Sequence, residues 1–359
     1  MGVSLSITSH LTMGAIYSYN KPSNLRDYVY TRNFTQSLPN LSGKVFAVTG
    51  TSVGSLGFAT VKTLLEKGAR IICLNRWDAA SDKGKEFINA LKALGSDAVL
   101  LVRCDLLDLT SVRAAAAEVR AMLELADCHG LDALFNNAGI MAMADERTKE
   151  GFEIQMLTNH TSHFLLTKLL LPELERAAER TGEARIVNIT SEGRKGPPFN
   201  DLNPKSFQRN VPKGGLGNDT PVGRLARYQQ SKLANCAFTY ALDEKLRSKN
   251  SKVKALLCHP GLSASNLQVA TAQDSDCLSF LLALLAWGMQ SLHDGSVAGI
   301  RCLCDADLAS GSFLGPTQGM GWMRGPPELI TPEAKLKSGK NLDTLWAESE
   351  AAVGERFEI

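Results

Sequence analysis

The sequence predicts an α/β protein built on one doubly wound parallel sheet with helices on both faces. Three observations support this class. Short apolar runs alternate with longer segments of helical periodicity from Gly43 to about Pro316. The runs are apolar at successive positions, which is typical of strands that are buried on both faces of a sheet. A glycine-rich segment follows the first run and precedes a helical pattern, as expected at the first turn of a doubly wound fold.

The strands and helices can be placed in chain order. Strands are predicted at Val45–Thr49, Arg70–Leu74, Ala98–Arg103, Leu131–Asn136, Arg185–Thr190 and Val253–Cys258. Helices are predicted at Phe58–Glu66, Lys83–Leu94, Ser111–Ala126, Phe152–Arg180 and Leu225–Arg247. The β-α-β-α-β order is that of a Rossmann-like fold.

Three regions differ in texture. Residues 1–42 form a polar N-terminal extension that is nearly free of acids. Residues 43–325 contain the alternating strands and helices, and we interpret them as one domain. Residues 326–359 are predicted to be a loop and a short helix that pack on that domain.

Composition excludes some functions. The 359 residues are 44% hydrophobic and 21% charged, with a formal net charge of +2, which is ordinary for a globular protein. The absence of a dense Lys/Arg stripe argues against a nucleic-acid partner. The eight cysteines are scattered, and Cys302 and Cys304 have no second pair to complete a metal site. We therefore predict reduced thiols and no metal.

The N-terminal segment and the longest apolar run indicate where in the cell the protein lies. The N-terminus lacks a basic segment followed by an apolar core, so no secretory signal is predicted. Residues 278–289 are too few to span a membrane. We expect a cytoplasmic or organelle-stromal protein, soluble or peripherally attached to a membrane. The start Met1-Gly2 fits a myristoylation pattern; an unmodified arm and a weak targeting segment are the alternatives. A homodimer also stays open.

The first strand runs into the glycine-rich loop Thr49–Gly57. Glycines let a backbone turn tightly and approach a pyrophosphate, whose charge is stabilised at the helix N-terminus. Between a strand and a helix, this loop predicts a dinucleotide site. Its predicted cofactor-binding residues are Gly50, Ser52, Gly54, Ser55, Leu56 and Gly57.

The end of the second strand bears on the choice of cofactor. An acid there would accept hydrogen bonds from ribose hydroxyls, whereas an arginine accommodates a 2′-phosphate. This sequence has Arg76, with Asp78 two positions later. We predict NADP(H) rather than NAD(H); a solvated Arg76, with Asp78 serving an NAD ribose, is the alternative.

Tyr228 and Lys232 are four residues apart in a helical segment and so share one face. A free tyrosine has a pKa near 10, and a neighbouring ammonium group lowers it. Such a pair is a frequent coincidence on helix surfaces. Here it follows the glycine-rich loop and the segment Asn136–Gly139, and that order predicts a proton-transfer pair.

These motifs together resemble the short-chain dehydrogenase/reductase family over roughly residues 43–320. The family pattern T-G-x-x-x-G-x-G is one residue longer here, so Ser55 or Gly54 takes the middle position. The resemblance implies further cofactor contacts beside the adenine, along the cofactor and beside the nicotinamide, from Asp105, Leu106, Asn137, Ala138, Gly139, Tyr228, Lys232, Pro260, Gly261 and Ser265. Asn136 or Asn137 is alternatively a turn residue.

The resemblance also implies four catalytic residues. Tyr228 transfers the proton, Ser191 orients the substrate oxygen, and Lys232 binds the nicotinamide ribose and tunes Tyr228. Asn159 holds a proton-relay water. The alternatives are that Ser191 caps a strand and that Asn159 is a buried polar group of a helix.

Within the family, the sequence most resembles the retinol-dehydrogenase-like and WW-domain-oxidoreductase-like branch. That branch shares the long spacer 192–227 between the serine and the tyrosine. It implies a hydrophobic alcohol, aldehyde or ketone, such as a retinoid, steroid or isoprenoid. A tetrapyrrole (protochlorophyllide-type) reductase and a non-catalytic dinucleotide-sensing scaffold are the alternatives. The apolar stretch Leu278–Trp287 is interpreted as a substrate lid, a core helix or a membrane contact.

Overall fold

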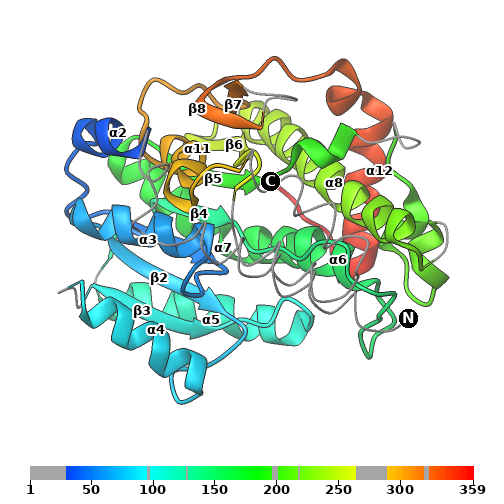
Figure 1. Ribbon diagram of the computed structural model, residues 1–359, viewed down its shortest axis with the longest axis horizontal. Coiled ribbons are helices and arrows are strands. Elements are labelled where there is room, and N and C mark those ends of the chain that lie inside the picture. The colour runs from blue at the N-terminus through cyan, green and yellow to red at the C-terminus, as the bar shows by residue number, and fades with distance from the viewer. Residues whose placement is uncertain are drawn as a thin grey trace, which may run out of the picture.

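The computed structural model describes residues 30–94, 98–126, 128–195, 201–216, 219–263, 289–318 and 323–359. In these ranges an eight-stranded sheet has the order β3-β2-β1-β4-β5-β6-β7-β8 (Figure 1). The strands are β1 Val45–Thr49, β2 Arg70–Asn75, β3 Val99–Arg103, β4 Ala133–Asn136, β5 Ala184–Ile189, β6 Val253–Cys258, β7 Phe313–Gln318 and β8 Arg324–Leu329.

The pairing of the strands confirms the predicted Rossmann-like, doubly wound class. Every pair is parallel except β7 with β8, which is antiparallel. The strand order reverses between β1 and β4, because β2 and β3 lie on one side of β1 and the later strands on the other. Ligands of doubly wound sheets bind outside the carboxyl ends of the strands at this reversal.

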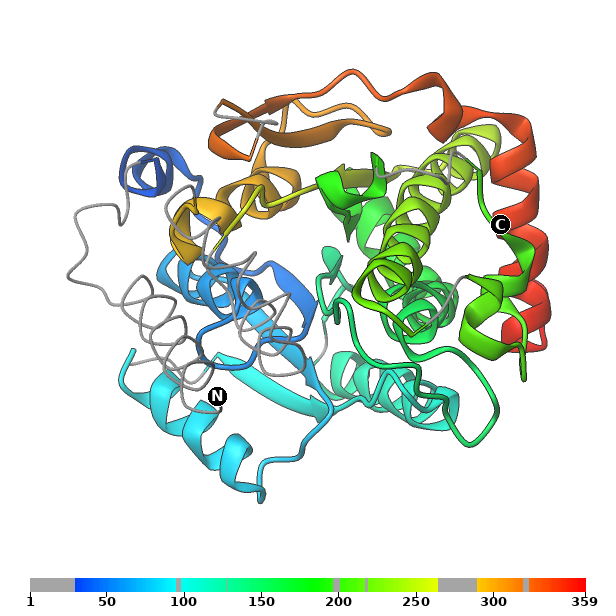
Figure 2. The ribbon, with the colours of Figure 1, turned by 45° about the vertical axis from the view of Figure 1, so that its right-hand side comes forward.

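Helices cover both faces of the sheet (Figure 2). The longer ones are α3 Leu56–Glu66, α4 Asp82–Lys92, α5 Leu109–Leu125, α7 Ser162–Thr181, α8 Pro221–Ser248, α11 Leu292–Cys304 and α12 Gly339–Val353. On one face α3, α4 and α11 form a core with the sheet, and on the other α5, α7 and α8 do. The C-terminal helix α12 packs against α8 as an outer layer.

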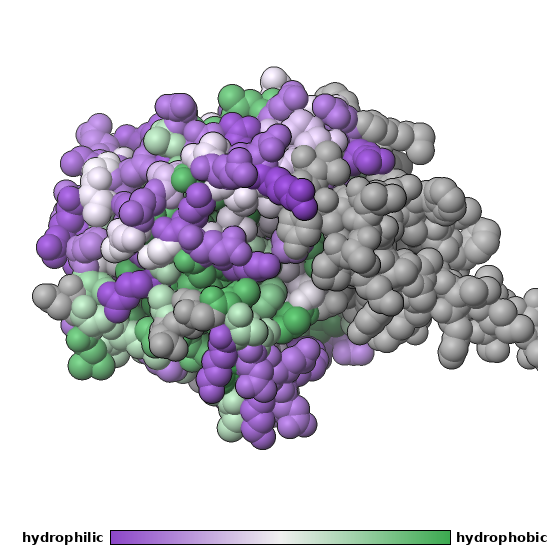
Figure 3. Space-filling view, turned by 60° about the vertical axis from the view of Figure 1, so that its left-hand side comes forward, coloured by the Kyte–Doolittle hydropathy of each residue, from purple (hydrophilic) through white to green (hydrophobic). Residues whose placement is uncertain are grey.

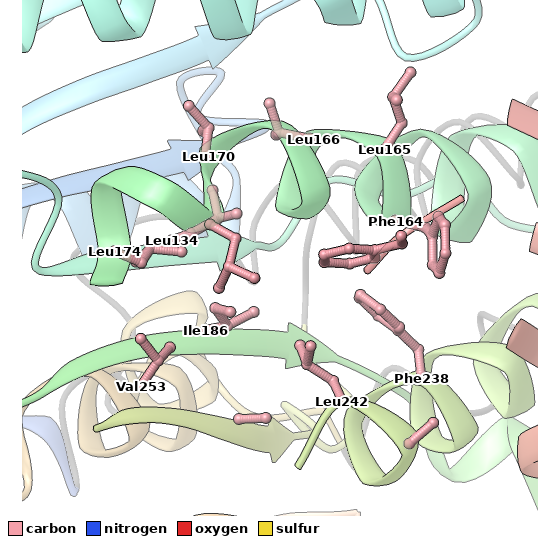
Figure 4. Close-up of a cluster of buried hydrophobic side chains, with 14 of the residues drawn as sticks. Leu134, Phe164, Leu165, Leu166, Leu170, Leu174, Ile186, Phe238, Leu242 and Val253 are labelled. Atoms are coloured by element: carbon pink, nitrogen blue, oxygen red, sulfur yellow. The ribbon is translucent and has the colours of Figure 1, made fainter. Parts of the chain in front are cut away.

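Alternating residues of each central strand supply these two cores. In β1, Val45 and Ala47 belong to the cluster under α7 and α8, whereas Phe46 and Val48 belong to the cluster under α3 and α11. Figure 4 shows the first cluster, where Phe164 of α7 faces Phe238 of α8, with ring centroids 5.3 Å apart. Both faces of the strand are therefore buried, as the unbroken apolar runs predict.

The predicted helix Phe152–Arg180 is divided in the structure. A short helix, α6 Ile154–Met156, leads into a π-helical turn, Leu157–Thr161, before α7 begins. A π-helical turn carries one more residue than an α-helical turn and is frequent at functional sites. Asn159 lies in this turn.

The last two strands and one helix were not predicted from the sequence. Residues 326–359 were predicted to be a loop and a closing helix, but β8 extends into them, and neither β7 nor α11 was predicted. Prolines mask the strand pattern, since β7 contains Pro316 and β8 contains Pro326 and Pro327. Proline removes a backbone donor and is tolerated at the edge of a sheet, which is where β8 lies.

The flanking regions are joined to the domain. A short helix of the N-terminal extension, α2 Thr31–Ser37, is held by Asp294 of α11, which accepts hydrogen bonds from the backbone of Tyr30 and Thr31. The boundary placed at residues 325 and 326 falls inside β8.

Hydrophilic side chains cover most of the described surface in Figure 3. No helix in the described ranges is long and apolar enough to cross a membrane.

Candidate active site

The glycine-rich loop is folded tightly against the end of β4. A side chain at Gly50 would come within 2.8 Å of Ala138, and one at Gly57 within 2.4 Å of the Gly50 carbonyl oxygen. Gly50 has a φ of +70° and Gly54 of +78°, a region that favours glycine. The longer loop therefore uses Gly54 for its turn.

Helix α3 begins at the residue after Ser55. The Ser55 hydroxyl accepts a hydrogen bond from the Phe58 N–H (3.1 Å) and donates one to the Gly50 carbonyl (3.1 Å). Ser55 is thus the N-cap of α3, and it closes the loop on itself. Of the two residues predicted for the middle position, Gly54 forms the turn and Ser55 caps the helix, with Leu56 as the first helical residue.

Two asparagines hold the loop from neighbouring strands. The Asn137 amide donates to the Thr49 carbonyl (2.9 Å) and to the Gly50 carbonyl (3.2 Å). Asn75, at the end of β2, accepts from the Thr51 N–H (2.9 Å) and donates to the Thr51 hydroxyl (2.8 Å). The Asn137 side chain is therefore bonded to the loop backbone and shapes the site through it.

The two residues predicted to discriminate between cofactors have different surroundings. Arg76 is exposed directly after β2. The Asp78 carboxylate accepts hydrogen bonds from the backbone of Ala80 and Ser81, both at 3.0 Å. Asp78 is therefore engaged in the turn that precedes α4.

The remaining predicted cofactor residues lie at the ends of β3, β4 and β6. Asp105 and Leu106 follow β3, and the Asp105 carboxylate accepts from the Leu107 N–H (3.0 Å). Pro260 and Gly261 follow β6, and Gly261 has a φ of +63°. Ser265 lies outside the described residues, as do the stretch Leu278–Trp287 and the arm 1–29.

Ser191 and Tyr228 meet across the end of β5. The Ser191 hydroxyl oxygen accepts a hydrogen bond from the Gly193 N–H (3.1 Å). A side chain at Gly193 would lie 3.3 Å both from this oxygen and from the Tyr228 ring. Gly193 thus leaves the space in which the hydroxyl and the phenol approach each other.

Asn159 and Lys232 come together beside Gly139. A side chain at Gly139 would lie 3.2 Å from the Asn159 amide oxygen and 3.3 Å from the Lys232 ammonium. The Asn159 amide donates to Ser231 (2.8 Å) and exchanges hydrogen bonds with the backbone of Ile140. The four predicted catalytic residues therefore gather at the carboxyl ends of β4 and β5, beside the glycine-rich loop.

Burial shifts the pKa values of the tyrosine and lysine. It raises the pKa of Tyr228 to about 12, although a hydrogen bond from Ser191 acts in the opposite direction. It lowers the pKa of Lys232 to about 8. Desolvation therefore dominates the pKa of Tyr228, and the expected lowering by Lys232, whose ammonium lies 5.7 Å from the centre of the Tyr228 ring, is not found.

Two buried arginines beside these residues were missed. Arg194 contacts the Ser191 carbonyl (3.2 Å). Arg227, which precedes Tyr228, contacts the Met143 carbonyl (3.3 Å) and Asp219 (3.0 Å). Arginine is rarely buried without partners. The signal in the sequence that could have identified Arg194 and Arg227 is that each lies close to a catalytic motif, after Ser191 or before Tyr228.

Metal ligands do not assemble in the described ranges. Their His, Cys, Asp and Glu side chains form no group of three or more that could hold a metal ion. Three histidines are buried among the described residues. Burial disfavours the charged ring and lowers their pKa values, to about 3 for His160 and about 4 for His163 and His259.

Comparison with known proteins points to one family. A family model described as short chain dehydrogenase matches residues 44–200. Retinol dehydrogenase 12 of Homo sapiens is 31% identical, with 89% of each chain covered. An oxidoreductase of Schizosaccharomyces pombe is 36% identical over 64% of this chain and 63% of its own length. A crystal structure of a protein from Mycobacterium Paratuberculosis has a TM-score of 0.66 and 30% identity, covering 90% of this chain and 98% of the other.

Proposed function

Since the chain belongs to the short-chain dehydrogenase/reductase family of oxidoreductases, in its retinol-dehydrogenase-like branch, we propose that it interconverts an alcohol and an aldehyde or ketone with NADP(H). The observation that supports this most is the meeting of Tyr228, Ser191, Lys232 and Asn159 at the ends of β4 and β5. Gly50 and Gly57 let the loop pack tightly against Ala138 and Asn137, and the position of this loop between β1 and the N-terminus of α3 fits the pyrophosphate of a dinucleotide.

In this proposal the bound nicotinamide supplies or accepts the hydride at the substrate carbon. During reduction the Tyr228 hydroxyl donates its proton to the substrate oxygen. A pKa of about 12 keeps the phenol protonated at neutral pH, so Tyr228 is ready to act as an acid. The Ser191 oxygen accepts from Gly193, and in this proposal its hydroxyl proton turns from the Tyr228 oxygen to the substrate oxygen. Below pH 8 Lys232 is charged and favours the phenolate that proton donation leaves behind.

NADP(H) is proposed over NAD(H) from the surroundings of two side chains. Arg76 is exposed at the end of β2, where a 2′-phosphate would lie in this fold. Asp78 is already bonded to two backbone amides. Both bonds go to its Oδ1 and hold the carboxylate in the turn that precedes α4.

The proposed substrate is a hydrophobic carbonyl compound or its alcohol. Relatives at 31–33% identity are named retinol dehydrogenases, and retinol and its aldehyde are hydrophobic. In this proposal affinity rises with substrate length, by about 0.8 kcal/mol or roughly fourfold for each buried methylene.

The experiment measures NADPH oxidation with aldehydes of increasing length, retinal, a ketosteroid and a porphyrin-type carbonyl. Tyr228→Phe should lose at least about a hundredfold in kcat, the usual contribution of a general acid, while still binding NADPH. Tyr240→Phe is the matched control, because Tyr240 is a buried tyrosine of the same helix whose hydroxyl has no hydrogen-bond partner among the described residues. Turnover that survives in Tyr228→Phe would contradict the proposed mechanism. Binding of NADPH without turnover of any carbonyl would favour the dinucleotide-sensing scaffold.

A further inference from the structure

Arg194 is a fully buried cation in the turn that follows Ser191. It belongs to the 3-10 helical turn Glu192–Lys195, and its side chain is 0% exposed. One end of the guanidinium donates to the Ser191 carbonyl (3.2 Å) and to the Glu192 carboxylate (2.7 Å). The other end donates to Glu333 (3.0 Å), more than a hundred residues later in the chain.

The charges around Arg194 are balanced. Glu192 and Glu333 also bind Lys195, at 2.6 and 3.3 Å, and the guanidinium lies 4.8 Å from the centre of the Phe313 ring on β7. Burial alone would raise the pKa of each carboxyl, but Arg194 and Lys195 together hold both pKa values below the ordinary value. Both acids are therefore ionised at neutral pH, and the buried cation keeps its partners.

This cluster sets the geometry of the turn that orients Ser191. The Ser191 carbonyl accepts from the Arg194 backbone N–H (3.1 Å) as well as from its side chain. The next peptide, between residues 192 and 193, supplies the Gly193 N–H, which donates to the Ser191 hydroxyl oxygen. A change in the position of the Ser191 carbonyl would move this N–H, because both belong to one tight turn.

We propose that Arg194 is a positioning residue for Ser191, and that Glu333 ties this function to the segment that follows β8. The inference rests on the proposed function, since it assigns Arg194 a role in orienting the Ser191 hydroxyl toward the substrate oxygen. Arg194 itself contacts no reacting atom. A lysine at this position can satisfy one or two of the three acceptors but not all of them, because its ammonium is a point charge without the arginine fork.

The chain offers a matched control near the start of β5, the strand that leads to Ser191. Arg185 lies in β5, with its side chain 4% exposed. It donates to the carbonyls of Cys302 and Asp305 and pairs with Glu183. It therefore has the same burial and the same kinds of partner as Arg194, at the opposite end of the strand from Ser191.

The experiment compares Arg194→Lys with Arg185→Lys in the full-length chain. Both should lower the melting temperature. Only Arg194→Lys should lower kcat, on the order of tenfold to a hundredfold, the loss that a small misplacement of a reacting group produces. The KM and the dissociation constant for NADPH should change by less than about twofold. Equal kcat values in the two variants would overturn the proposal.

Two further measurements cover the remaining cases. If Arg194→Lys does not fold, Glu333→Gln should also lower kcat. Glu350→Gln, which loosens only the C-terminal tail, should not.

The amide hydrogen exchange rates of residues 191–195 report on the order of the turn and do not depend on enzymatic turnover. Faster exchange in Arg194→Lys but not in Arg185→Lys supports the positioning role even if no carbonyl is reduced, an outcome that would count against the proposed function alone. Unchanged exchange in both variants would overturn the role of Arg194.

Discussion

The Arg76 side chain is exposed to solvent. If it holds the 2′-phosphate of NADPH, Arg76→Ala removes a charge-assisted hydrogen bond that contributes about 1.5–3 kcal/mol. NADPH should then bind roughly ten- to a hundredfold more weakly, with NADH affinity unchanged. Fluorescence titration of both cofactors measures this. Arg70→Ala is the control, since Arg70 is exposed at the other end of β2. An unchanged ratio of the two affinities would mean that Arg76 is simply solvated.

Lys232 gives the active site a pH dependence. Burial lowers its pKa to about 8, so the lysine is charged below that pH and neutral above it. The phenol of Tyr228, with a pKa of about 12, stays protonated throughout. Because only charged Lys232 stabilises the developing phenolate, kcat/KM for carbonyl reduction should fall as pH rises through about 8. The profile from pH 6 to 10 measures this. Lys232→Met should be slow and lack this fall, and a flat wild-type profile would contradict the prediction.

The elements differ in how far the sequence could predict them. Strands β1 and β6 have the predicted bounds, because each is a short β-branched or Leu-rich run that stays buried along most of its length. Strand β8 was missed, because its pairing depends on β7 and not on its own proline-rich sequence. The π-helical turn at Asn159 was also missed. Its backbone is set by packing between α6, α7 and α8, which a helical periodicity does not reveal.

The residues of the candidate site also differ in how far the sequence could predict them. The glycine-rich loop and the Tyr228–Lys232 pair are local patterns, and the structure brings them together with Ser191 and Asn159. The pKa of Tyr228 was predicted to be lowered, because the sequence shows the neighbouring lysine but not the extent of burial. Arg194 was missed, because its partner Glu333 is distant in the chain. The roles assigned to these residues stay predictions.

At the scale of the whole molecule, the C-terminal segment is part of the main core and not an appendage. Trp346 and Phe357 belong to the same cluster as the sheet residues under α7 and α8. Phe357 packs at 5.3 Å from Phe164 and 5.2 Å from Trp346, measured between ring centroids. Glu355 pairs with Arg113 of α5 and Lys168 of α7. Residues 355–357 thus contact α5 and α7, two helices of one face, as well as α12.

This arrangement predicts that the tail stabilises the whole domain in one cooperative unit. Phe357 is buried, and removing a buried phenylalanine side chain costs about 3–5 kcal/mol. Phe357→Ala should lower the free energy of unfolding by that amount in urea, with coincident transitions in near- and far-ultraviolet circular dichroism. Leu125→Ala is the control, since Leu125 is 89% exposed and its loss should cost less than about 0.5 kcal/mol. A similar small cost for Phe357→Ala, or an early separate transition, would show that the tail folds independently of the sheet. In that case Glu333, which precedes α12, would be a weak anchor for Arg194, and the effect of Glu333→Gln on kcat should be correspondingly small.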